Sequence, residues 1–272
     1  MEQQRLGWSP TSAEYAEVPA FGTLGGVECE WYAAEGTTGL PDGLGAVAVI
    51  LMPVASVPPV FLSAYDAPLC EPSYDAVNCR MTRVDGEIWA MARAGWSLSE
   101  PPTDILAATI DAAVTNARST WDAQRADVAP TWWTLDACAD LHESMSLEAA
   151  AGPYVDGWWE GSEQPEMALL RSAGVEQYCP WYTDGDATGS DAPFHIGNTT
   201  IAPGAAWNWP AILATPGTEP ISVAGAEDAV VATTFGIVYA TDGVNVISVS
   251  AGDDIAQVAD IAGRALSALA AG

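Results

Sequence analysis

An aspartate-rich segment offers the clearest metal-ligating pattern in the chain. Residues 184–191 read DGDATGSD. Calcium-binding loops place oxygen ligands at alternate positions and a glycine at the sixth, where the backbone turns sharply. Asp184, Asp186 and Thr188 fit the first, third and fifth positions. The twelfth position holds His195 where a bidentate glutamate belongs. The segment predicts either a calcium site formed by Asp184, Asp186, Thr188 and Asp191 or, as we favour, an ordinary solvated turn.

Tryptophan is the second residue type that could contact a ligand, and the chain has 12. Exposed indole rings stack on sugars or cover apolar ligands, whereas buried rings fill cores and interfaces. Trp31 and Trp181 recur at matching positions of the internal repeat described below, so we expect them in the core. Trp159, Trp207 and Trp209 have no such counterpart and are the predicted ligand-binding residues. Structural packing remains the alternative for all three.

The residues available for catalysis are few. A serine triad would need His142 or His195 as its base, because these are the only histidines. We expect His142 on the surface of a helix and His195 in a loop. The chain contains no Gly-x-Ser-x-Gly motif. Paired carboxylates could serve a glycosidase, but among 36 acidic residues some pair always looks suitable. The sequence therefore predicts no catalytic residue and no enzyme.

The charge of the chain limits its partners. The 272 residues include 36 acidic and 8 basic ones, a net charge of −28, and every basic residue is an arginine. Without lysine the chain cannot form a P-loop or a Schiff base. Its negative surface repels nucleic acid and anionic membranes. The expected partners are neutral ligands, cations or basic proteins, unless the charge serves solubility alone. No apolar run is long enough to span a membrane.

The chain repeats itself over a distance of about 150 residues. Cys29-Glu30-Trp31-Tyr32 recurs as Cys179-Pro180-Trp181-Tyr182, and Asp85-Gly86 recurs as Asp242-Gly243. Three weaker matches keep the same order, including residues 75–77 with residues 228–230. Ordered matches at a nearly constant offset indicate a tandem duplication. We expect one unit over 1–127 and a second over 128–272.

Each unit is predicted to be an antiparallel sheet closed by a helix. Strands are expected at 79–84 and 87–94, and at 230–239 and 244–250, because Asp-Gly favours a two-residue hairpin turn. Apolar residues at helical spacing predict a closing helix in each unit, with Thr103 as the N-cap in the first and Asp253 or Asp254 in the second. The fold class is therefore α+β. A further helical stripe follows Thr134, its expected N-cap, and its counterpart in the first unit would fall before residue 1.

The five cysteines follow the same symmetry. Spacing alone leaves their pairing open. Cys138 and Cys179 would join the extra helix to the Cys-x-Trp strand. Cys70 and Cys79 are both absent from the matching region of the second unit, near Ile221 and at Ala232. We therefore predict the disulfides Cys138–Cys179 and Cys70–Cys79, with Cys29 unpaired. Disulfides indicate an oxidising compartment. Five buried thiols in a cytosolic protein are the alternative, and a zinc site is disfavoured because no Cys-x-x-Cys occurs.

Three segments of the second unit resemble a known group of proteins. They are residues 135–138 (LDAC), Cys179-x-Trp181, and residues 223–229 (VAGAEDA), followed by a hairpin and an alanine-rich helix. This pattern resembles actinobacterial secreted lipoproteins and related extracellular sensor domains of unknown function. The resemblance covers residues 132–272 well and residues 7–125 less well. It implies an exported α+β module, usually anchored by an N-terminal lipid, with no enzyme activity and no agreed ligand.

Three functions are compatible with these observations. The leading hypothesis is an exported, non-enzymatic protein of the cell envelope that binds a ligand, with no obligatory cofactor. A surface protein without a small ligand is the alternative, and it would show an exposed apolar patch where a binding protein has a pocket. An extracellular hydrolase is the third hypothesis and would need a histidine or a carboxylate pair in a pocket.

Overall fold

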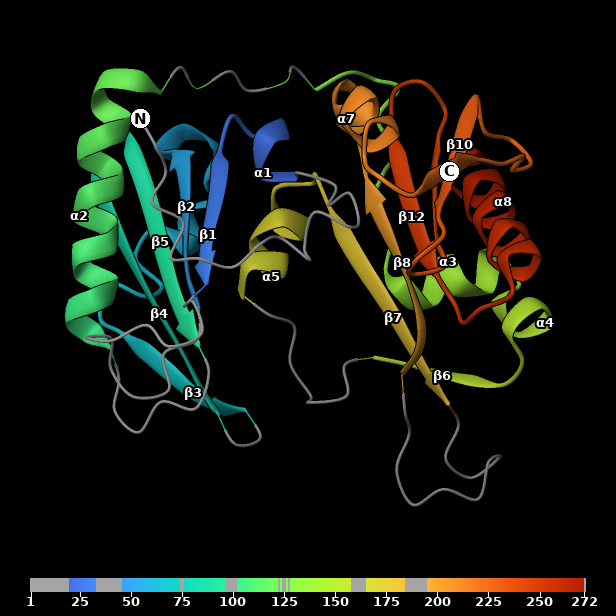
Figure 1. Cartoon of the computed structure of the whole chain (residues 1–272), viewed down its shortest axis with the longest axis horizontal. Helices are drawn as coiled ribbons and strands as arrows, with labels where there is room; N and C mark the ends of the chain where they lie inside the picture. Colours follow the sequence, from blue (N-terminus) through green and yellow to red (C-terminus); the bar gives the residue numbers. More distant parts are fainter. Residues whose placement is uncertain are drawn as a thin grey trace. The chain divides into compact units, whose positions relative to one another are not determined.

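The computed structural model describes residues 20–32, 46–73, 76–95, 102–121, 123, 126, 128–157, 165–183 and 195–271. The chain divides into two compact units, formed mainly by residues 21–126 and by residues 127–272. Each unit has its own antiparallel sheet and a helix that follows the last strand of that sheet (Figure 1). The predicted α+β class is confirmed at this level.

The first unit contains a five-stranded sheet with the order β1-β2-β5-β4-β3. Its elements are α1 (Ala20–Thr23), β1 (Val27–Tyr32), β2 (Ala46–Pro53), η2 (Val54–Ser56), η3 (Pro59–Phe61), β3 (Leu69–Ser73), β4 (Ala76–Asp85), β5 (Ile88–Gly95) and α2 (Thr103–Thr120).

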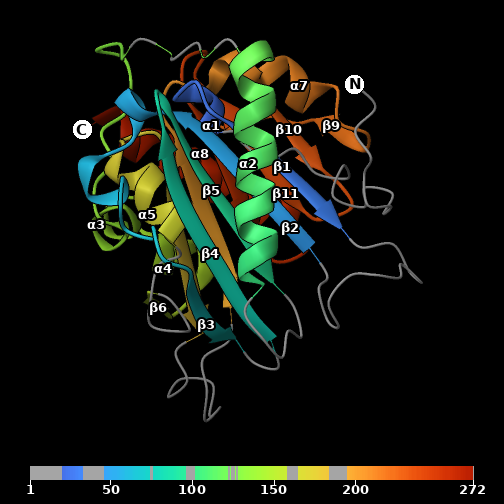
Figure 2. The ribbon, with the colours of Figure 1, turned by 90° about the vertical axis from the view of Figure 1, so that its left-hand side faces the viewer.

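Helix α2 covers one face of the first sheet and lies across its strands (Figure 2). The residues of α2 that face the sheet are Leu106, Ile110, Val114 and Ala117, which are all buried. Their spacing is that of one helical face, so the stripe seen in the sequence is the packing surface. The helix begins one residue earlier than we expected, because Pro102 and not Thr103 is the N-cap. The opposite face of the sheet buries Trp89, whose indole donates to the Phe61 carbonyl oxygen at 3.2 Å.

The second unit contains a seven-stranded sheet with the order β6-β7-β8-β12-β11-β10-β9. Its elements are α3 (Cys138–Ser144), α4 (Leu147–Ala151), β6 (Tyr154–Asp156), α5 (Pro165–Ser172), β7 (Gln177–Thr183), β8 (His195–Ala202), η4 (Ala205–Asn208), α7 (Trp209–Leu213), β9 (Thr218–Pro220), β10 (Asp228–Ala232), β11 (Ile237–Thr241), β12 (Val246–Ser250) and α8 (Ile255–Ala271).

Both faces of the second sheet are covered by helices. One face packs against α8, α3 and α4, with Trp181 and Val258 fully buried between them. The other face packs against η4 and α7, where Trp209 and Ile212 join Tyr239 of β11. Asp254 caps α8 through its carboxylate, as the sequence predicted, and accepts from the backbone nitrogen of Ala256 at 3.0 Å.

Two boundaries differ from the sequence prediction in the second unit. The strand expected over 230–239 is two strands, β10 and β11, joined by a turn with Gly236 at φ +65°. The extra helix begins at Cys138 with Ala137 as its N-cap, so Thr134 is not the cap we predicted. In both cases apolar residues continue past the end of the element, and periodicity alone does not mark the break.

Five strands of each sheet share one order and one register. Cys29 lies opposite Val49 in the β1–β2 pair, and Cys179 lies opposite Thr199 in the β7–β8 pair, so both positions differ by 150. Likewise Arg83 and Ala90 are partners across β4–β5, and Ala240 and Ile247 are partners across β11–β12, each 157 positions later. The strands β1-β2-β5-β4-β3 therefore correspond to β7-β8-β12-β11-β10.

This correspondence corrects two details of the sequence comparison. Arg80 pairs with Leu69, and their counterparts Ile237 and Ala232 are the last pair before the β10–β11 turn. Cys70 and Cys79 therefore lie on a part of the β3–β4 hairpin that has no counterpart, because the second unit turns before this point. The sequence comparison predicted that they correspond to Ile221 and Ala232, and they do not. Ala76 and Val77 belong to β4, whose counterpart is β11. The sequence comparison matched them to residues 229–230, which belong to β10, so that match is wrong.

Among the described residues, none of the helices has the length and apolar character needed to cross a membrane.

Candidate functional site

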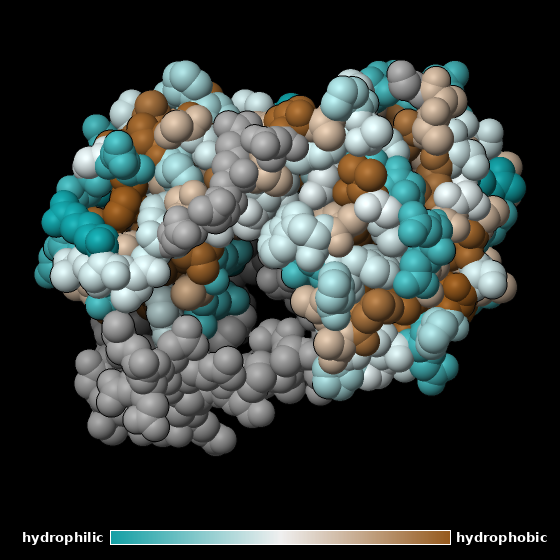
Figure 3. All heavy atoms as spheres, turned by 90° about the horizontal axis from the view of Figure 1, so that it is seen from above, coloured by the Kyte–Doolittle hydropathy of each residue, from teal (hydrophilic) through white to brown (hydrophobic). Residues whose placement is uncertain are grey.

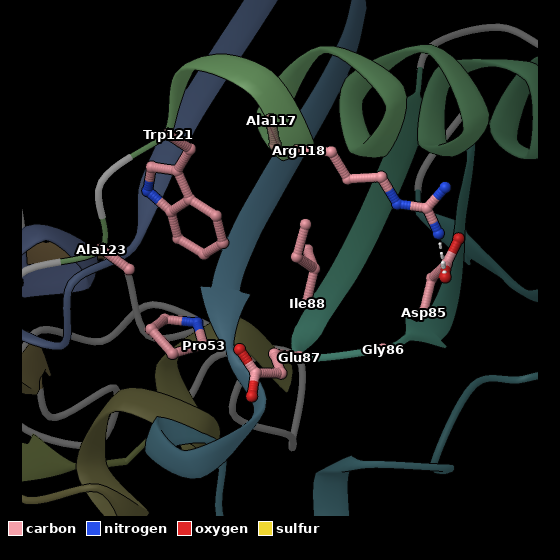
Figure 4. Close-up of a pocket in the computed structure, with 9 residues that line it drawn as sticks. All are labelled: Pro53, Asp85, Gly86, Glu87, Ile88, Ala117, Arg118, Trp121 and Ala123. Atoms are coloured by element: carbon pink, nitrogen blue, oxygen red, sulfur yellow. Dashed lines mark hydrogen bonds and ion pairs between the residues drawn. The ribbon is translucent and has the colours of Figure 1, made fainter.

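A pocket of about 420 Å³ lies at one end of the first sheet, where the end of α2 meets the turn between β4 and β5. Its lining is shown in Figure 4 and consists of Pro53, Asp85, Gly86, Glu87, Ile88, Ala117, Arg118, Trp121 and Ala123. All of these residues belong to one unit. The pocket is therefore formed by a single compact body and needs no second unit to complete it.

The turn and the helix end position these side chains. Gly86 has φ +63°, the left-handed conformation that a tight hairpin turn requires and that glycine adopts without strain. The turn thereby places Glu87 directly before β5. On the other side, Trp121 ends α2, and its backbone nitrogen donates to the Ala117 carbonyl oxygen at 2.9 Å. Beyond it, the Ala126 nitrogen donates to the Thr23 carbonyl oxygen at 3.0 Å, which fixes the path of the chain out of the helix.

The charged groups around the pocket comprise one ion pair and one further carboxylate. The Arg118 guanidinium forms an ion pair with the Asp85 carboxylate, so this rim group is neutralised (Figure 4). The Glu87 side chain is exposed, and its carboxylate lies on the side of the pocket where Pro53 lies (Figure 4). Its backbone carbonyl oxygen, in contrast, is bound by the Val54 nitrogen at 2.9 Å. The pocket thus combines a fixed backbone with one acidic side chain at its rim.

The lining residues have the chemistry to bind a cation. An indole ring attracts a cation through its negative face, and a nearby carboxylate adds to this attraction. Ile88, Ala117 and Pro53 supply an apolar wall for the rest of a ligand. The lining also holds two carboxylates, Asp85, which is already in an ion pair, and Glu87. The pocket can hold an amine or a guanidinium next to an apolar group.

Cys29 is the free cysteine of the described residues, and it lies outside this pocket on the edge strand β1. Burial raises the pKa of its thiol, and the charge of neighbouring Glu28 raises it further. The remaining cysteines form the disulfides Cys70–Cys79 and Cys138–Cys179, which is the pairing that the sequence predicted. Each disulfide closes within one unit.

His142 is fully buried in α3, which corrects our expectation that it lies on the surface. Its Nδ1 atom bonds the Asp156 carboxylate of β6, and its ring meets Trp181 edge-on with the centroids 5.4 Å apart. Burial lowers the pKa of His142, although the hydrogen bond to Asp156 acts in the opposite direction. Burial thus favours the neutral imidazole, which is part of the core.

The His142–Asp156 pair resembles two members of a catalytic triad but lacks access to a substrate. The Nε2 atom of His142 is buried and has no hydrogen-bond partner among the described residues. A serine hydrolase needs its nucleophile at this nitrogen. His195 is the first residue of β8 and not a loop residue, and it lies against the ring of Tyr182 with the centroids 5.5 Å apart. The burial of His142 argues against this residue as the base of a triad.

The three predicted ligand-binding tryptophans have different surroundings. Trp209 is 9% exposed, and its indole nitrogen donates to Asp228 at 2.9 Å, so it is a packing residue of the second unit. Trp207 is 51% exposed. Trp159 lies outside the described residues. The structure therefore does not bring the three into one described site, and a ligand role for Trp207 stays a prediction.

The proposed calcium ligands Asp184, Asp186, Thr188 and Asp191 also lie outside the described residues. Within the part of the chain that the structure describes, no three histidine, cysteine, aspartate or glutamate side chains gather in a metal-binding arrangement.

Trp121 and Glu87 are the site residues that the sequence analysis missed. Trp121 continued the apolar stripe of α2, and Glu87 followed the Asp-Gly turn at the start of a predicted strand. The sequence predicts the element that holds each residue. It does not show that the end of α2 lies beside the β4–β5 turn, because this neighbourhood depends on the register of the folded sheet. Comparison with protein-family models, with curated proteins and with solved structures found no match to this chain.

Proposed function

We propose that this chain is an exported, non-enzymatic binding protein of the cell envelope, and that its first unit binds a cationic group in the pocket beside Trp121. The observation that carries the proposal is that the Glu87 carboxylate and the Trp121 indole line the same pocket together with an apolar wall (Figure 4). An aromatic ring and a carboxylate together select an ammonium or a guanidinium. The net charge of −28 attracts such ligands over a longer range.

Export is supported by the cysteines. Two disulfides persist in oxidising compartments and are rare in the cytosol. The resemblance of residues 132–272 to secreted lipoproteins and extracellular sensor domains agrees with this compartment. Mass spectrometry of the unreduced protein from its native host tests it. Export predicts a mass lower than the reduced chain by four hydrogen atoms, whereas the full reduced mass would remove this support.

A tandem duplication is part of the same proposal. Its support is the common strand order and the shared register of β1-β2-β5-β4-β3 and β7-β8-β12-β11-β10. Duplication explains why both sheets end in a helix that packs on the strands. The two copies then differ in function, because the pocket described above is formed by residues of the first unit alone.

A pocket-based function is better supported than a flat interaction surface. The large apolar side chains that are exposed come from scattered elements, such as Val60, Val84, Val128 and Phe235. On the face shown in Figure 3, apolar residues form separate spots among polar ones. Partner surfaces usually gather their apolar residues into one contiguous patch.

Indole NMR resonances of ¹⁵N-labelled protein test the binding of a cation. Tryptamine is the probe, and N-acetyltryptamine is its neutral control. We expect tryptamine to shift the Trp121 resonance, which is assigned with the Trp121→Phe variant. Glu87→Gln should weaken tryptamine binding about tenfold, because it removes the charge partner of the ammonium. Asp104→Asn removes the same charge from the first turn of α2, away from the pocket, and should leave binding unchanged. Equal shifts with both probes would overturn the proposal.

A further inference from the structure

The second unit covers the surface that corresponds to the pocket with a segment of its own chain. The Asn245 amide nitrogen donates to the Thr131 carbonyl oxygen at 2.9 Å, and the Trp133 backbone nitrogen donates to the Asn245 amide oxygen at 3.3 Å. That same amide oxygen accepts from the Gly204 nitrogen at 3.0 Å. One buried asparagine therefore holds residues 131–133, which follow a turn closed by the Trp132 nitrogen and the Ala129 carbonyl oxygen, against the end of the sheet.

The two surfaces correspond residue by residue. The turn Asp85-Gly86-Glu87-Ile88 precedes β5, and the turn Asp242-Gly243-Val244-Asn245 precedes β12, 157 positions later. On the neighbouring strand, Pro53 at the end of β2 corresponds to Pro203 after β8 at the offset of 150. Ile88 corresponds to Asn245, and Pro53 corresponds to Pro203. The first member of each pair lines the pocket, and the second lies at the end of the sheet that the 131–133 segment covers.

The described residues of the first unit leave this surface open as the pocket of about 420 Å³. Ile88 replaces Asn245, so the side-chain amide that holds a backbone in the second unit is absent at this position. Val54 replaces Gly204, whose backbone lies directly under the Trp132 ring. At these two positions the first unit is therefore apolar, which suits an inserted side chain more than a hydrogen-bonded backbone.

We propose that the pocket of the first unit receives a peptide segment of a partner protein, with an aromatic side chain against Ile88 and Trp121 and a neighbouring lysine or arginine at Glu87. This inference rests on the proposed function, because it names the source of the cationic group. In the second unit a segment of the chain, residues 131–133, occupies the corresponding end of the sheet. The Glu87 carboxylate and the net charge of −28 favour a basic residue beside the aromatic one.

Synthetic peptides titrated into ¹⁵N-labelled protein test the proposal, because their own tryptophans remain invisible. The first peptide is the acetylated and amidated copy of residues 129–135, APTWWTL. The second is its Thr134→Lys form. The third replaces both tryptophans of the second by alanine. We expect the second peptide to shift the Trp121 resonance and to bind at least tenfold more tightly than the third. The first should bind more weakly than the second.

Two variants identify the basis of binding. Glu87→Arg reverses an exposed charge without disturbing the core, and should abolish the preference for the lysine-bearing peptide. Asp104→Asn is the matched control and should preserve that preference. If tryptamine binds and no peptide does, the peptide mode is wrong while the cation-binding function stands. If neither tryptamine nor any peptide shifts the Trp121 resonance, both proposals fall. If all three peptides bind equally, aromatic recognition is wrong.

Discussion

The indole ring of Trp132 lies directly against the backbone of Gly204. A Cβ atom built on this glycine would stand 2.1 Å from a ring carbon of Trp132, and the residue has φ +71°. Contact this close leaves room only for hydrogen, and the left-handed backbone favours glycine as well. The packing of the 131–133 segment on the second unit thus depends on one residue without a side chain.

Gly204→Ala should lower the free energy of unfolding of the second unit by about 2 kcal/mol or more. The methyl group would strain the left-handed backbone and displace the Trp132 ring. Denaturant unfolding followed by circular dichroism measures the loss. Gly86→Ala is the matched control, because Gly86 has φ +63° but no atom within 4 Å of the added Cβ. Equal losses for the two variants would show that the ring contact contributes nothing.

The two disulfides should contribute unequally to stability. Cys138 and Cys179 are separated by 41 residues, and Cys70 and Cys79 by 9. A longer closed loop removes more entropy from the unfolded chain, which corresponds to about 4 kcal/mol for the first disulfide and about 2.5 kcal/mol for the second. The double alanine variants C138A/C179A and C70A/C79A, compared in urea unfolding, measure both losses. A larger loss for C70A/C79A would contradict this entropic ranking.

His142 should make the second unit less stable as the pH falls. Because burial lowers its pKa in the folded state, the unfolded chain takes up a proton first on acidification, near its ordinary pKa of about 6.5. Stability from this group is fully present above that pH and decreases below it. His142→Asn keeps a donor to Asp156 and does not titrate. The stability advantage of the original protein over H142N should therefore shrink between pH 7.5 and pH 5.

The H142N variant also separates this effect from the general charge of the chain. Partial neutralisation of the net charge of −28 on acidification acts on both proteins alike, so their difference reports His142 alone. A difference that stays constant from pH 7.5 to pH 5 would show that the pKa of His142 is not lowered by folding.

Cys29 should react slowly with thiol reagents. Burial and the charge of Glu28 both raise the pKa of this thiol, so little thiolate is present at pH 7.5. Glu28→Gln removes the second cause and leaves the Arg93 guanidinium, which is bound to Glu28 at 2.6 Å, as a nearby positive charge. Alkylation by iodoacetamide, followed by mass spectrometry, should be several-fold faster in this variant. Reaction of the original protein at the rate of free glutathione would contradict the raised pKa.

The sequence was most informative where local patterns are strong. The buried stripe of α2 and the Asp-Gly turn at Asp85 lie where periodicity and turn chemistry predict them. The cysteine pairing was predictable because the comparison of the two units limited the alternatives that spacing leaves open. The break between β10 and β11 was missed, since apolar residues flank Gly236 on both sides.

The candidate site was harder to predict because its residues are distant in sequence. Pro53, Glu87 and Trp121 lie on three different elements, and no local pattern links them. The burial of His142 was missed for a related reason. A single helix of seven residues offers too little periodicity to assign its faces, and Trp181 covers the imidazole from a strand 39 residues further along the chain.

The order of the cysteines has a consequence for biogenesis. Each disulfide joins two cysteines that are neighbours in the order of the chain, Cys70 with Cys79 and Cys138 with Cys179. A chain that is translocated N-terminus first would expose each partner directly after the other, and sequential oxidation would then give the native pairs. Cys29 is the exception, since it emerges first and meets Cys70 before Cys79 arrives. Correct oxidation therefore requires this thiol to be sheltered in β1 early or its mispaired form to be reshuffled by an isomerase.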